Sequence, residues 1–441
     1  MRRTLALLIV LFGPPLNAAI VERVECRRDP TQTYALFLPP NYTEQTNHPV
    51  LFIFDPRSRG AMAAEIFRPA AERFGWIILS SNNTRSDGPD DPNTKAINAM
   101  WPELSRYAID PKRIYASGFS GGGILTLLLG VSTGALAGVI DVGGRMPDEL
   151  SLDKANFAHY GASGRFDFNF LEMGAVDAAF ARLGLPHRLD RFDGTHGWLP
   201  QELATTAVTW LEVVAMQQKK RAIDQGLIDE LYAQDLARRI ARRGESLERF
   251  ELMKRTFDGL REMGEVDEAI EKLRTGPELK RDRDLEQREA RYEKSMLRAM
   301  VSASQALRAA DPLPPPIAIR AAYRLDEITR NTRGPLADAA QRVLESIFTQ
   351  TSFYLPRDFF DAGDAYRAAA VLEIARAIKP ALPFVRVQLA RAYVRTRQGA
   401  KAAAEIEAAL ANGLQDRESL RTDPDLKRLI GQNEKLRKLL E

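Results

Sequence analysis

Between residues 50 and 192, short apolar runs rich in β-branched or aromatic residues alternate with longer amphipathic segments. The predicted strands are Val50–Phe54, Trp76–Ser80, Arg113–Ser117, Leu136–Asp141, Phe157–Gly161 and His187–Phe192. The predicted helices are Met62–Phe74, Thr94–Ala108, Ile124–Val131 and Phe168–Leu183. Strands joined through helices run parallel by right-handed crossovers, so we expect an α/β fold with helices on both faces of the sheet. Ile20–Arg27 and Thr33–Leu38 have no helix between them and predict an antiparallel edge, which makes eight strands.

The composition of the chain changes near residue 211. All four tryptophans and all four histidines lie before that point, and the 230 residues after it are rich in Arg, Glu, Ala and Leu with helical periodicity. A chain of 441 residues is also too long for one ordinary core. We therefore predict an α/β domain over residues 20–215 and an all-α domain over residues 225–441.

The all-α half contains an internal repeat. Two sets of residues align 34 positions apart, namely Leu355, Phe359, Ala368, Leu372 and Ala375 with Leu389, Tyr393, Ala402, Ile406 and Ala409. This period resembles that of the tetratricopeptide repeat, although the early Trp and Gly of that family are missing. Pro356 predicts that the first helix of its unit begins there. A non-repeating helical bundle remains the alternative, and the proline-rich stretch 308–316 predicts a break between helical blocks.

The N-terminus has the three parts of a secretory signal peptide. Arg2 and Arg3 precede an apolar run from Leu5 to Phe12, and a Gly-Pro-Pro break and small residues follow it. The run is too short to span a bilayer. We predict a signal peptide over residues 1–19 and a mature protein that is periplasmic or secreted; a buried first strand is the alternative.

Ser120 lies in the segment Gly118-Phe119-Ser120-Gly121-Gly122, which fits G-x-S-x-G between a predicted strand and a predicted helix. A nucleophile at the end of a strand requires a sharp turn into the helix, and the residues two before and two after it must then be small. Gly118 and Gly122 meet that requirement. The segment lacks the Lys-Ser/Thr of a phosphate-binding loop. We therefore interpret Ser120 as a candidate nucleophile rather than part of a flexible turn.

A serine nucleophile needs a base, and the base needs an orienting carboxylate. His196 lies in a Gly/Thr-rich loop after the last predicted strand, where packing gives it no evident role, and we predict that it is the base. Asp167 lies in the loop after the preceding strand and is the predicted acid. The resulting order Ser, Asp, His is the one expected for this architecture.

Other residues remain as alternatives for these two roles. Asp190, Asp193 and Glu172 could replace Asp167 as the acid, although the two aspartates stand on or beside the strand before His196. Among the other histidines, we expect structural positions for His159 and His187. His48, which precedes the strand Val50–Phe54, is interpreted as a solvated turn residue.

Two N–H groups would be needed to stabilise an oxyanion. Gly121 directly follows Ser120 at a helix N-terminus, and Arg57 follows Pro56 in the loop after Val50–Phe54. These are the predicted donors. Asn82, Asn83 and Trp198 are candidates for lining a substrate pocket; an ordinary Asn-Asn turn is the alternative for the first two. The segments between the last four predicted strands contain no long insertion that could form a lid over the site. We therefore expect an open site.

Residues 20–215, with the GFSGG and DGTHGW segments, resemble the α/β-hydrolase fold. Within it the sequence is similar to the polyhydroxybutyrate-depolymerase and feruloyl-esterase-like group of secreted esterases. The resemblance implies acyl transfer through a serine ester, with Ser120 attacking, His196 moving the proton and Asp167 orienting the imidazole. It implies no metal and no cofactor. The family usually has His-Gly where this chain has Asp55-Pro56, and Asp55 either braces the loop or is an ordinary turn residue.

Three function classes follow from these observations. The first is a secreted serine esterase that acts on a small-molecule or polymeric ester and whose helical domain binds a protein partner. The second is an interaction scaffold with a weak or silent hydrolase domain, and the third is a serine peptidase of the same fold. The net charge of +3 gives no reason to expect a nucleic-acid partner.

Overall fold

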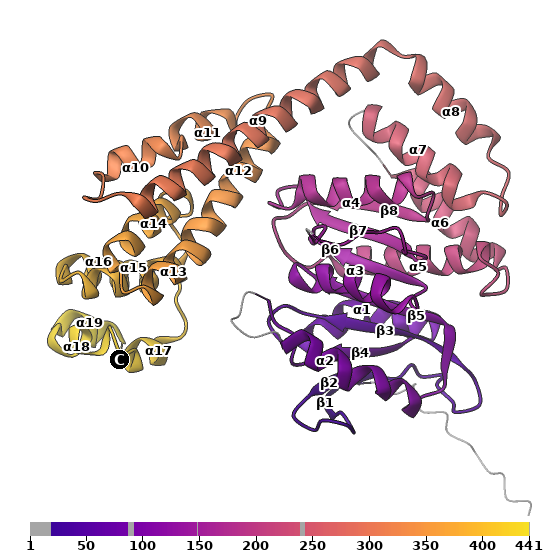
Figure 1. Ribbon diagram of the computed structural model, residues 1–441, viewed down its shortest axis with the longest axis horizontal. Helices are drawn as coiled ribbons and strands as arrows, with labels where there is room; N and C mark the ends of the chain where they lie inside the picture. Colours follow the sequence, from indigo (N-terminus) through magenta and orange to yellow (C-terminus); the bar gives the residue numbers. More distant parts are fainter. Residues whose placement is uncertain (1–18, 87–91, 148, 239–242, 441) are drawn as a thin grey trace, which may run out of the picture. The chain divides into compact units, whose positions relative to one another are not determined.

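A computed structural model describes residues 19–86, 92–147, 149–238 and 243–440 (Figure 1). The predicted signal peptide therefore lies outside the described residues, except for Ala19. The chain divides into two compact units, the first ending at Asp282 and the second beginning at Arg283. Each unit is described by itself below. Among the described residues, none of the helices combines the length and the apolar character needed to cross a lipid bilayer.

The first unit is built on one eight-stranded sheet with the strand order β1-β2-β4-β3-β5-β6-β7-β8. The strands are β1 Val21–Glu25, β2 Thr33–Phe37, β3 His48–Phe54, β4 Ile77–Ser81, β5 Ile109–Phe119, β6 Gly138–Val142, β7 Ala158–Gly164 and β8 His187–Phe192. β2 pairs antiparallel with β1 and β4, and all other pairs are parallel. This is the sheet of an α/β-hydrolase, which confirms the predicted fold class.

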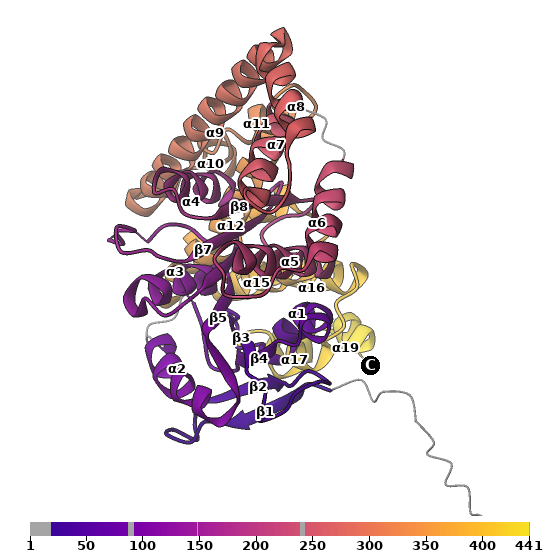
Figure 2. The same ribbon diagram turned by 90° about the vertical axis from the view of Figure 1, so that its right-hand side faces the viewer.

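Helices cover both faces of this sheet, and Figure 2 shows α2 and α3 on the side opposite α1 and α5. The helices are α1 Gly60–Phe74, α2 Pro92–Met100, the 3-10 helix η1 Trp101–Arg106, α3 Gly121–Thr133, α4 Phe170–Arg182 and α5 Gln201–Gln217. Side chains of β3 alternate between the two faces. Leu51 and Ile53 join the core with α1 and α5, whereas Phe52 joins the core with α2, α3 and α4.

Three further helices belong to the first unit, namely α6 Gln225–Ala237, α7 Arg243–Phe257 and α8 Gly264–Thr275. Leu231, Phe257 and Val266 from these helices share one apolar core with Trp210 of α5. The compact unit therefore continues to Asp282, past the boundary that we predicted at residues 215–225. The change in composition marks where strands stop, but it does not mark where the apolar core ends.

The second unit consists of helices. Helix α9 Pro277–Ala309 runs across the division between the units, and the helices that follow are α10 Pro316–Ala322, α11 Leu325–Asn331, α12 Ala337–Thr349, the π-helical turn η2 Gln350–Tyr354, α13 Leu355–Asp361, α14 Ala365–Ile378, α15 Pro383–Arg395, α16 Gly399–Ala411, α17 Arg417–Thr422, α18 Lys427–Gln432 and α19 Glu434–Leu440. The proline-rich stretch does separate α9 from α10, as predicted. Helices α14 and α16 begin 34 residues apart, at Ala365 and Gly399, so the period of the sequence is also the period of the helices.

Helix α13 begins at Leu355 and has Pro356 in its first turn, so a helix does start beside this proline, although no loop precedes it. The backbone is helical at Gln350, Tyr354 and Leu355, and α12, η2 and α13 follow one another without an intervening loop. A proline inside a helix lacks an N–H and crowds the carbonyl four residues earlier. The π-helical turn Gln350–Tyr354 lies directly before Pro356, and such turns locally change the α-helical hydrogen-bond pattern.

Candidate active site

The chain turns sharply from β5 into α3 at Ser120. This residue has φ 55° and ψ −117°, a backbone conformation that is uncommon for a residue other than glycine. Its N–H donates to the carbonyl oxygen of Val142 on the neighbouring strand, at 2.8 Å. The pairing of β5 with both β3 and β6 holds the turn at the carboxyl edge of the sheet. The serine hydroxyl is thus presented from a strained and well-braced turn.

Gly118 and Gly122 are required by this turn for steric reasons. A Cβ on Gly118 would overlap the carbonyl oxygen of Gly122, and a Cβ on Gly122 would overlap the carbonyl oxygen of Phe54 at the end of β3. The prediction that both positions must be small is confirmed. Gly121 is the first residue of α3, so its N–H has no partner within the helix and lies at the positive end of the helix dipole.

Ser120, His196 and Asp167 form one continuous hydrogen-bonded chain. His196 Nε2 lies 2.9 Å from Ser120 Oγ, and His196 Nδ1 lies 2.8 Å from Asp167 Oδ1. An ionised carboxylate only accepts, so Nδ1 carries the proton and Nε2 accepts from the serine hydroxyl. Asp167 is fully buried, whereas the imidazole is 18% exposed. Ser120 is also partly exposed, in keeping with the expected open site.

The alternative acids are held elsewhere. Asp190 is buried and binds Arg188 and Arg238 through its two oxygens, at 2.7 and 2.6 Å. Asp193 is exposed and lies 3.5 Å from Arg165. Glu172 lies in the first turn of α4. Of the four carboxylates considered, Asp167 is the one for which the described contacts include a hydrogen bond to His196.

The other histidines occupy structural positions. His187 binds Asp177 at 2.9 Å, and His159 is fully buried 3.6 Å from Asp141. Our interpretation of His48 as a solvated turn residue is wrong. It is the first residue of β3, it is buried, and its Nδ1 lies 2.9 Å from the carbonyl oxygen of Gly75.

The second predicted oxyanion donor is engaged within its own loop. The N–H of Arg57 donates to Asp55 Oδ1 at 2.8 Å. Arg57 is therefore not presented as a free donor, which corrects the expectation from the sequence. The physical reason is the replacement of His-Gly by Asp-Pro, because an aspartate side chain commonly accepts from the N–H two residues later.

Asp55 is fully buried and braces the loop, which was one of the two alternatives for it. It also accepts from the N–H and the guanidinium of Arg59 and from Trp198 Nε1. Burial by itself would raise the pKa of Asp55, but the hydrogen bonds from Arg59, Trp198 and Arg57 outweigh it and hold the pKa below its usual value. Asp55 is therefore ionised at neutral pH.

Two of the three candidate pocket residues make structural hydrogen bonds. Asn82 Nδ2 donates to the carbonyl oxygen of Glu22 at 2.9 Å, and Asn83 Oδ1 accepts from the N–H of Thr33 at 2.7 Å. These bonds join the loop after β4 to the strands at the sheet edge, which favours the ordinary-turn alternative. Trp198 instead packs beside the site, with its ring centroid 5.8 Å from that of Phe119.

Four residues near the site were not predicted from the sequence. The rings of Phe119 and Phe168 flank the imidazole of His196, with centroid distances of 4.6 and 4.0 Å. Ser86 packs against Gly121, because a Cβ on Gly121 would lie 2.5 Å from Ser86 Cβ. Gly143 has φ 57°, and its Cα lies so close to Asp167 and His196 that an added Cβ would contact both side chains. The adjacent glycines 143 and 144, directly after a predicted strand, were a signal that could have identified this close approach.

Gly143→Ala is expected to lower kcat at least about tenfold, because a small displacement of a catalytic group is costly. The new Cβ would lie 2.7 Å from Asp167 Oδ2 and 3.3 Å from His196 Nδ1. Gly184→Ala is the matched control, since Gly184 also has a positive φ, 66°, but nothing lies within 4 Å of its added Cβ. Ester turnover measured on both variants checks the prediction, and equal kcat values would contradict it.

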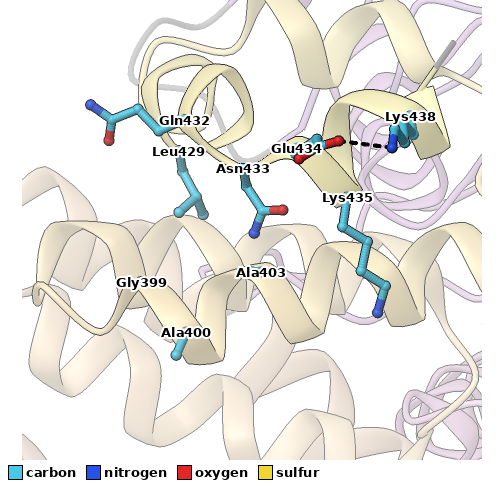
Figure 3. A pocket seen from close by; sticks show the side chains of 9 residues that line it. All are labelled: Gly399, Ala400, Ala403, Leu429, Gln432, Asn433, Glu434, Lys435 and Lys438. Atoms are coloured by element: carbon cyan, nitrogen blue, oxygen red, sulfur yellow. Dashed lines mark ion pairs between the residues drawn. The ribbon is translucent and has the colours of Figure 1, made fainter.

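Three surface hollows are lined by described residues other than the proposed triad. One of them, about 780 Å³, belongs to the second unit and lies between α16 and the segment that contains α18 and α19 (Figure 3). Glu434 and Lys438 on its rim form an ion pair at 2.8 Å. Two smaller hollows of the first unit are lined by residues 216–223 with 258–260 and by residues of the β1 and α1 region. None of these three hollows includes Ser120, Asp167 or His196 among the residues that line it.

Neither a family model nor a curated protein matches the chain. Solved structures with a partial likeness include an S-formylglutathione hydrolase from Staphylococcus aureus, at 14% identity and a TM-score of 0.36, over 45% of this chain and 98% of that chain. A ferulic acid esterase has 15% identity and a TM-score of 0.35, over 41% of this chain and 91% of that chain. An arylesterase has 13% identity and a TM-score of 0.36, over 45% of this chain and 86% of that chain. Because each likeness covers less than half of this chain, the fold assignment rests on the order and pairing of the strands.

Proposed function

We propose that this chain is a serine hydrolase that cleaves carboxylic esters through an acyl-enzyme. The observation that carries the proposal is the continuous hydrogen-bonded chain from Asp167 through His196 to the strained Ser120. Such an arrangement activates a serine hydroxyl, which is a weak nucleophile by itself. The position of Gly121 at the start of α3 supports an oxyanion site beside that hydroxyl.

The proposed reaction has two halves. Ser120 Oγ attacks the ester carbonyl carbon while His196 Nε2 takes its proton, and the resulting oxyanion accepts from the N–H of Gly121. His196 then donates that proton to the departing alcohol, which leaves Ser120 as an acyl ester. Water, deprotonated by His196, attacks this ester, and His196 returns the proton to Ser120 Oγ as the carboxylic acid leaves. Asp167 keeps the imidazole in the required tautomer and stabilises its protonated form.

A fluorophosphonate probe tests this proposal. Ser120 Oγ is expected to displace fluoride from the phosphorus atom and to retain the phosphonyl group. Peptide mapping by mass spectrometry should place the added mass on Ser120. Heat-denatured protein is the control and should remain unlabelled, because labelling requires the assembled triad. An unlabelled native protein, or a label on another serine, would contradict the proposal.

We further propose that the protein is exported and that its helical region binds a protein partner. Export is supported by the basic, apolar and small-residue parts of residues 1–19. A chain purified from cells that export it is expected to begin near Ala19 or Ile20 on N-terminal sequencing, and a first residue at Met1 would contradict this. Binding of a protein partner is supported by the helical repeat of 34 residues, since stacked helix pairs form extended binding surfaces.

One observation favours a second candidate function, that of an interaction scaffold whose hydrolase site is weak. The Arg57 N–H, which would complete an oxyanion site, is held by Asp55. Loss of one such donor lowers kcat about 100-fold to 1000-fold. A panel of chromogenic esters of graded chain length distinguishes the candidates, because a scaffold would react with the probe but turn over every ester slowly.

A further inference from the structure

Asp55 connects the loop after β3 to the loop that carries His196. Its Oδ1 atom accepts from the N–H of Arg57 at 2.8 Å, and its Oδ2 atom accepts from the indole Nε1 of Trp198 at 2.8 Å. Trp198 lies two residues after His196 in the loop between β8 and α5. The two loops are far apart in the sequence, and this buried carboxylate joins them by direct hydrogen bonds.

The indole of Trp198 in turn packs in the immediate surroundings of the imidazole. Its ring lies 5.8 Å from that of Phe119, and the Phe119 ring lies 4.6 Å from the imidazole of His196. Phe119 directly precedes Ser120. The indole also makes an edge contact with Phe67 of α1, with 6.0 Å between the ring centroids. The contacts therefore run from Asp55 through Trp198 and Phe119 to His196.

Asp55, where this series of contacts begins, is held by several further hydrogen bonds. Arg59, the residue before α1, binds the carboxylate through its N–H at 3.2 Å and through its guanidinium at 3.0 and 2.8 Å. The carbonyl oxygen of Asp55 accepts from the hydroxyl of Thr84 at 2.9 Å. A side chain held by this many partners in a buried position has one orientation available, so it can impose that orientation on the indole.

We propose that Asp55 is a positioning residue for the imidazole of His196, and that it acts through the indole of Trp198 and the ring of Phe119. The inference rests on the proposed function, since it assigns the imidazole its place in that reaction. Asp55 touches neither His196 nor Ser120 in the described contacts. Its contribution is to hold the loop of the base against the turn of the nucleophile, where a small displacement would be costly in rate.

Two substitutions break the link at different points. Trp198→Phe keeps an aromatic ring and removes the indole N–H that reaches Asp55. Asp55→Asn keeps the shape but introduces an NH2 group, and both carboxylate oxygens of Asp55 accept from N–H groups. Either orientation of the amide therefore sets a donor against a donor.

Each substitution is expected to lower kcat about tenfold, with KM changed less than about twofold, because substrate contacts remain and only the base is displaced. The double variant should be no slower than the slower single variant, since both changes break one link. Trp210→Phe is the matched control. It removes an indole hydrogen bond to Thr256, 3.2 Å long and in the same unit, and should leave kcat unchanged.

A spectroscopic measurement tests the same inference without turnover. The Nδ1–H proton of His196, bonded to Asp167, is expected as a strongly downfield proton NMR signal, assigned by its loss in His196→Ala. Trp198→Phe should shift or broaden this signal. The signal of His187, whose Nδ1 binds Asp177 at 2.9 Å, serves as the internal reference and should not move.

The possible outcomes separate the inference from the proposed function. If Trp198→Phe keeps both the wild-type kcat and the wild-type His196 signal, the inference is overturned. A purely structural brace would lower the unfolding temperature of Asp55→Asn but leave kcat intact below that temperature, and this outcome would also overturn the inference. If the fluorophosphonate probe does not label the wild-type protein and the protein does not turn over esters, the proposed function fails. The NMR signal of His196 then decides by itself whether Asp55 positions the imidazole.

Discussion

His196→Ala is expected to lower kcat for a chromogenic ester by about six orders of magnitude, the loss typical when the base of such a triad is removed. His196 Nε2 is the acceptor 2.9 Å from the Ser120 hydroxyl, and the described contacts of that hydroxyl include no other base. Without it the serine must lose its proton to water. The remaining turnover would come from substrate binding and the Gly121 N–H.

Steady-state kinetics on purified protein checks this prediction. His187→Ala is the matched control, because His187 also donates to an aspartate, Asp177, but on the amino end of β8 away from Ser120. That variant should keep its kcat. The kcat of Asp167→Asn should lie between those of His196→Ala and His187→Ala, about 10⁴-fold below wild type, since the imidazole would take the wrong tautomer. A kcat of His196→Ala within tenfold of the wild-type kcat would contradict the assignment of His196 as the base.

Asp235→Ala is expected to destabilise the first unit by about 3–5 kcal/mol, the cost of removing one partner from a buried ion pair. Asp235 of α6 binds the guanidinium of Arg188 through both oxygens, at 2.9 Å each, and also binds Arg249 of α7 at 3.2 Å. Arg188 is 1% exposed, so the substitution leaves its charge buried beside a single remaining carboxylate, Asp190.

Tryptophan fluorescence during urea unfolding measures this effect selectively. All four tryptophans lie in the first unit, so the signal reports that unit even when the two units unfold separately. Asp229→Ala is the matched control on the same helix. Asp229 is half exposed and pairs with Arg261, and such a pair contributes at most about 1 kcal/mol. Equal unfolding midpoints for the two variants would contradict the prediction.

The same buried network has a defined dependence on pH. Burial alone would raise the pKa of Asp190, but Arg188, Arg238 and Arg249 outweigh it and hold the pKa well below its usual value. A carboxyl whose pKa is lowered by folding contributes stability that is fully present above its unfolded pKa of about 3.9. That contribution is lost as the pH falls toward the lowered value. The network is therefore intact throughout the neutral range.

The network also explains why the chain cannot be divided where its composition changes. A truncation after residue 215 would remove Asp235 together with α6 and α7, leaving Arg188 on β8 without its bidentate partner. It would also uncover the apolar face of α5 on which Leu227 and Leu231 pack. A fragment that ends near Asp282 keeps both sets of contacts, and it is the appropriate choice for separate study of the hydrolase unit.

The periodic parts of the fold could be predicted from the sequence. Each predicted strand between Val50 and Phe192 corresponds to an observed strand with ends shifted by a few residues, because a strand buried on both faces has a nearly continuous apolar sequence. The helix start beside Pro356 could also be predicted, because α13 begins at Leu355. The sequence did not indicate that α12, η2 and α13 follow one another without a loop, or that the first compact unit continues past residues 215–225 to Asp282. Both features depend on packing and on the helical hydrogen-bond pattern rather than on local composition.

The geometry of the candidate site depended on close approaches that a linear sequence records only in part. Gly118 and Gly122 are close in sequence to Ser120, so their steric role could be inferred. Gly143 and Ser86 come from other loops, and their approach to the site depends on the strand order β4-β3-β5-β6 in the sheet. The engagement of the Arg57 N–H by Asp55 depends on one side-chain orientation, which the Asp-Pro sequence left open.

The amino-acid sequence by itself determined the alternation of strands and helices, the strained turn at Ser120, and the order in which Ser120, Asp167 and His196 occur. These properties follow from local sterics and from hydrophobic periodicity, which act over a few residues. Tertiary structure alone decided which carboxylate reaches His196, that α6–α8 complete the first unit, and that Asp55 reaches Trp198. Those outcomes depend on contacts between segments 29 to 143 residues apart, which form only when the sheet brings the ends of its strands to one edge.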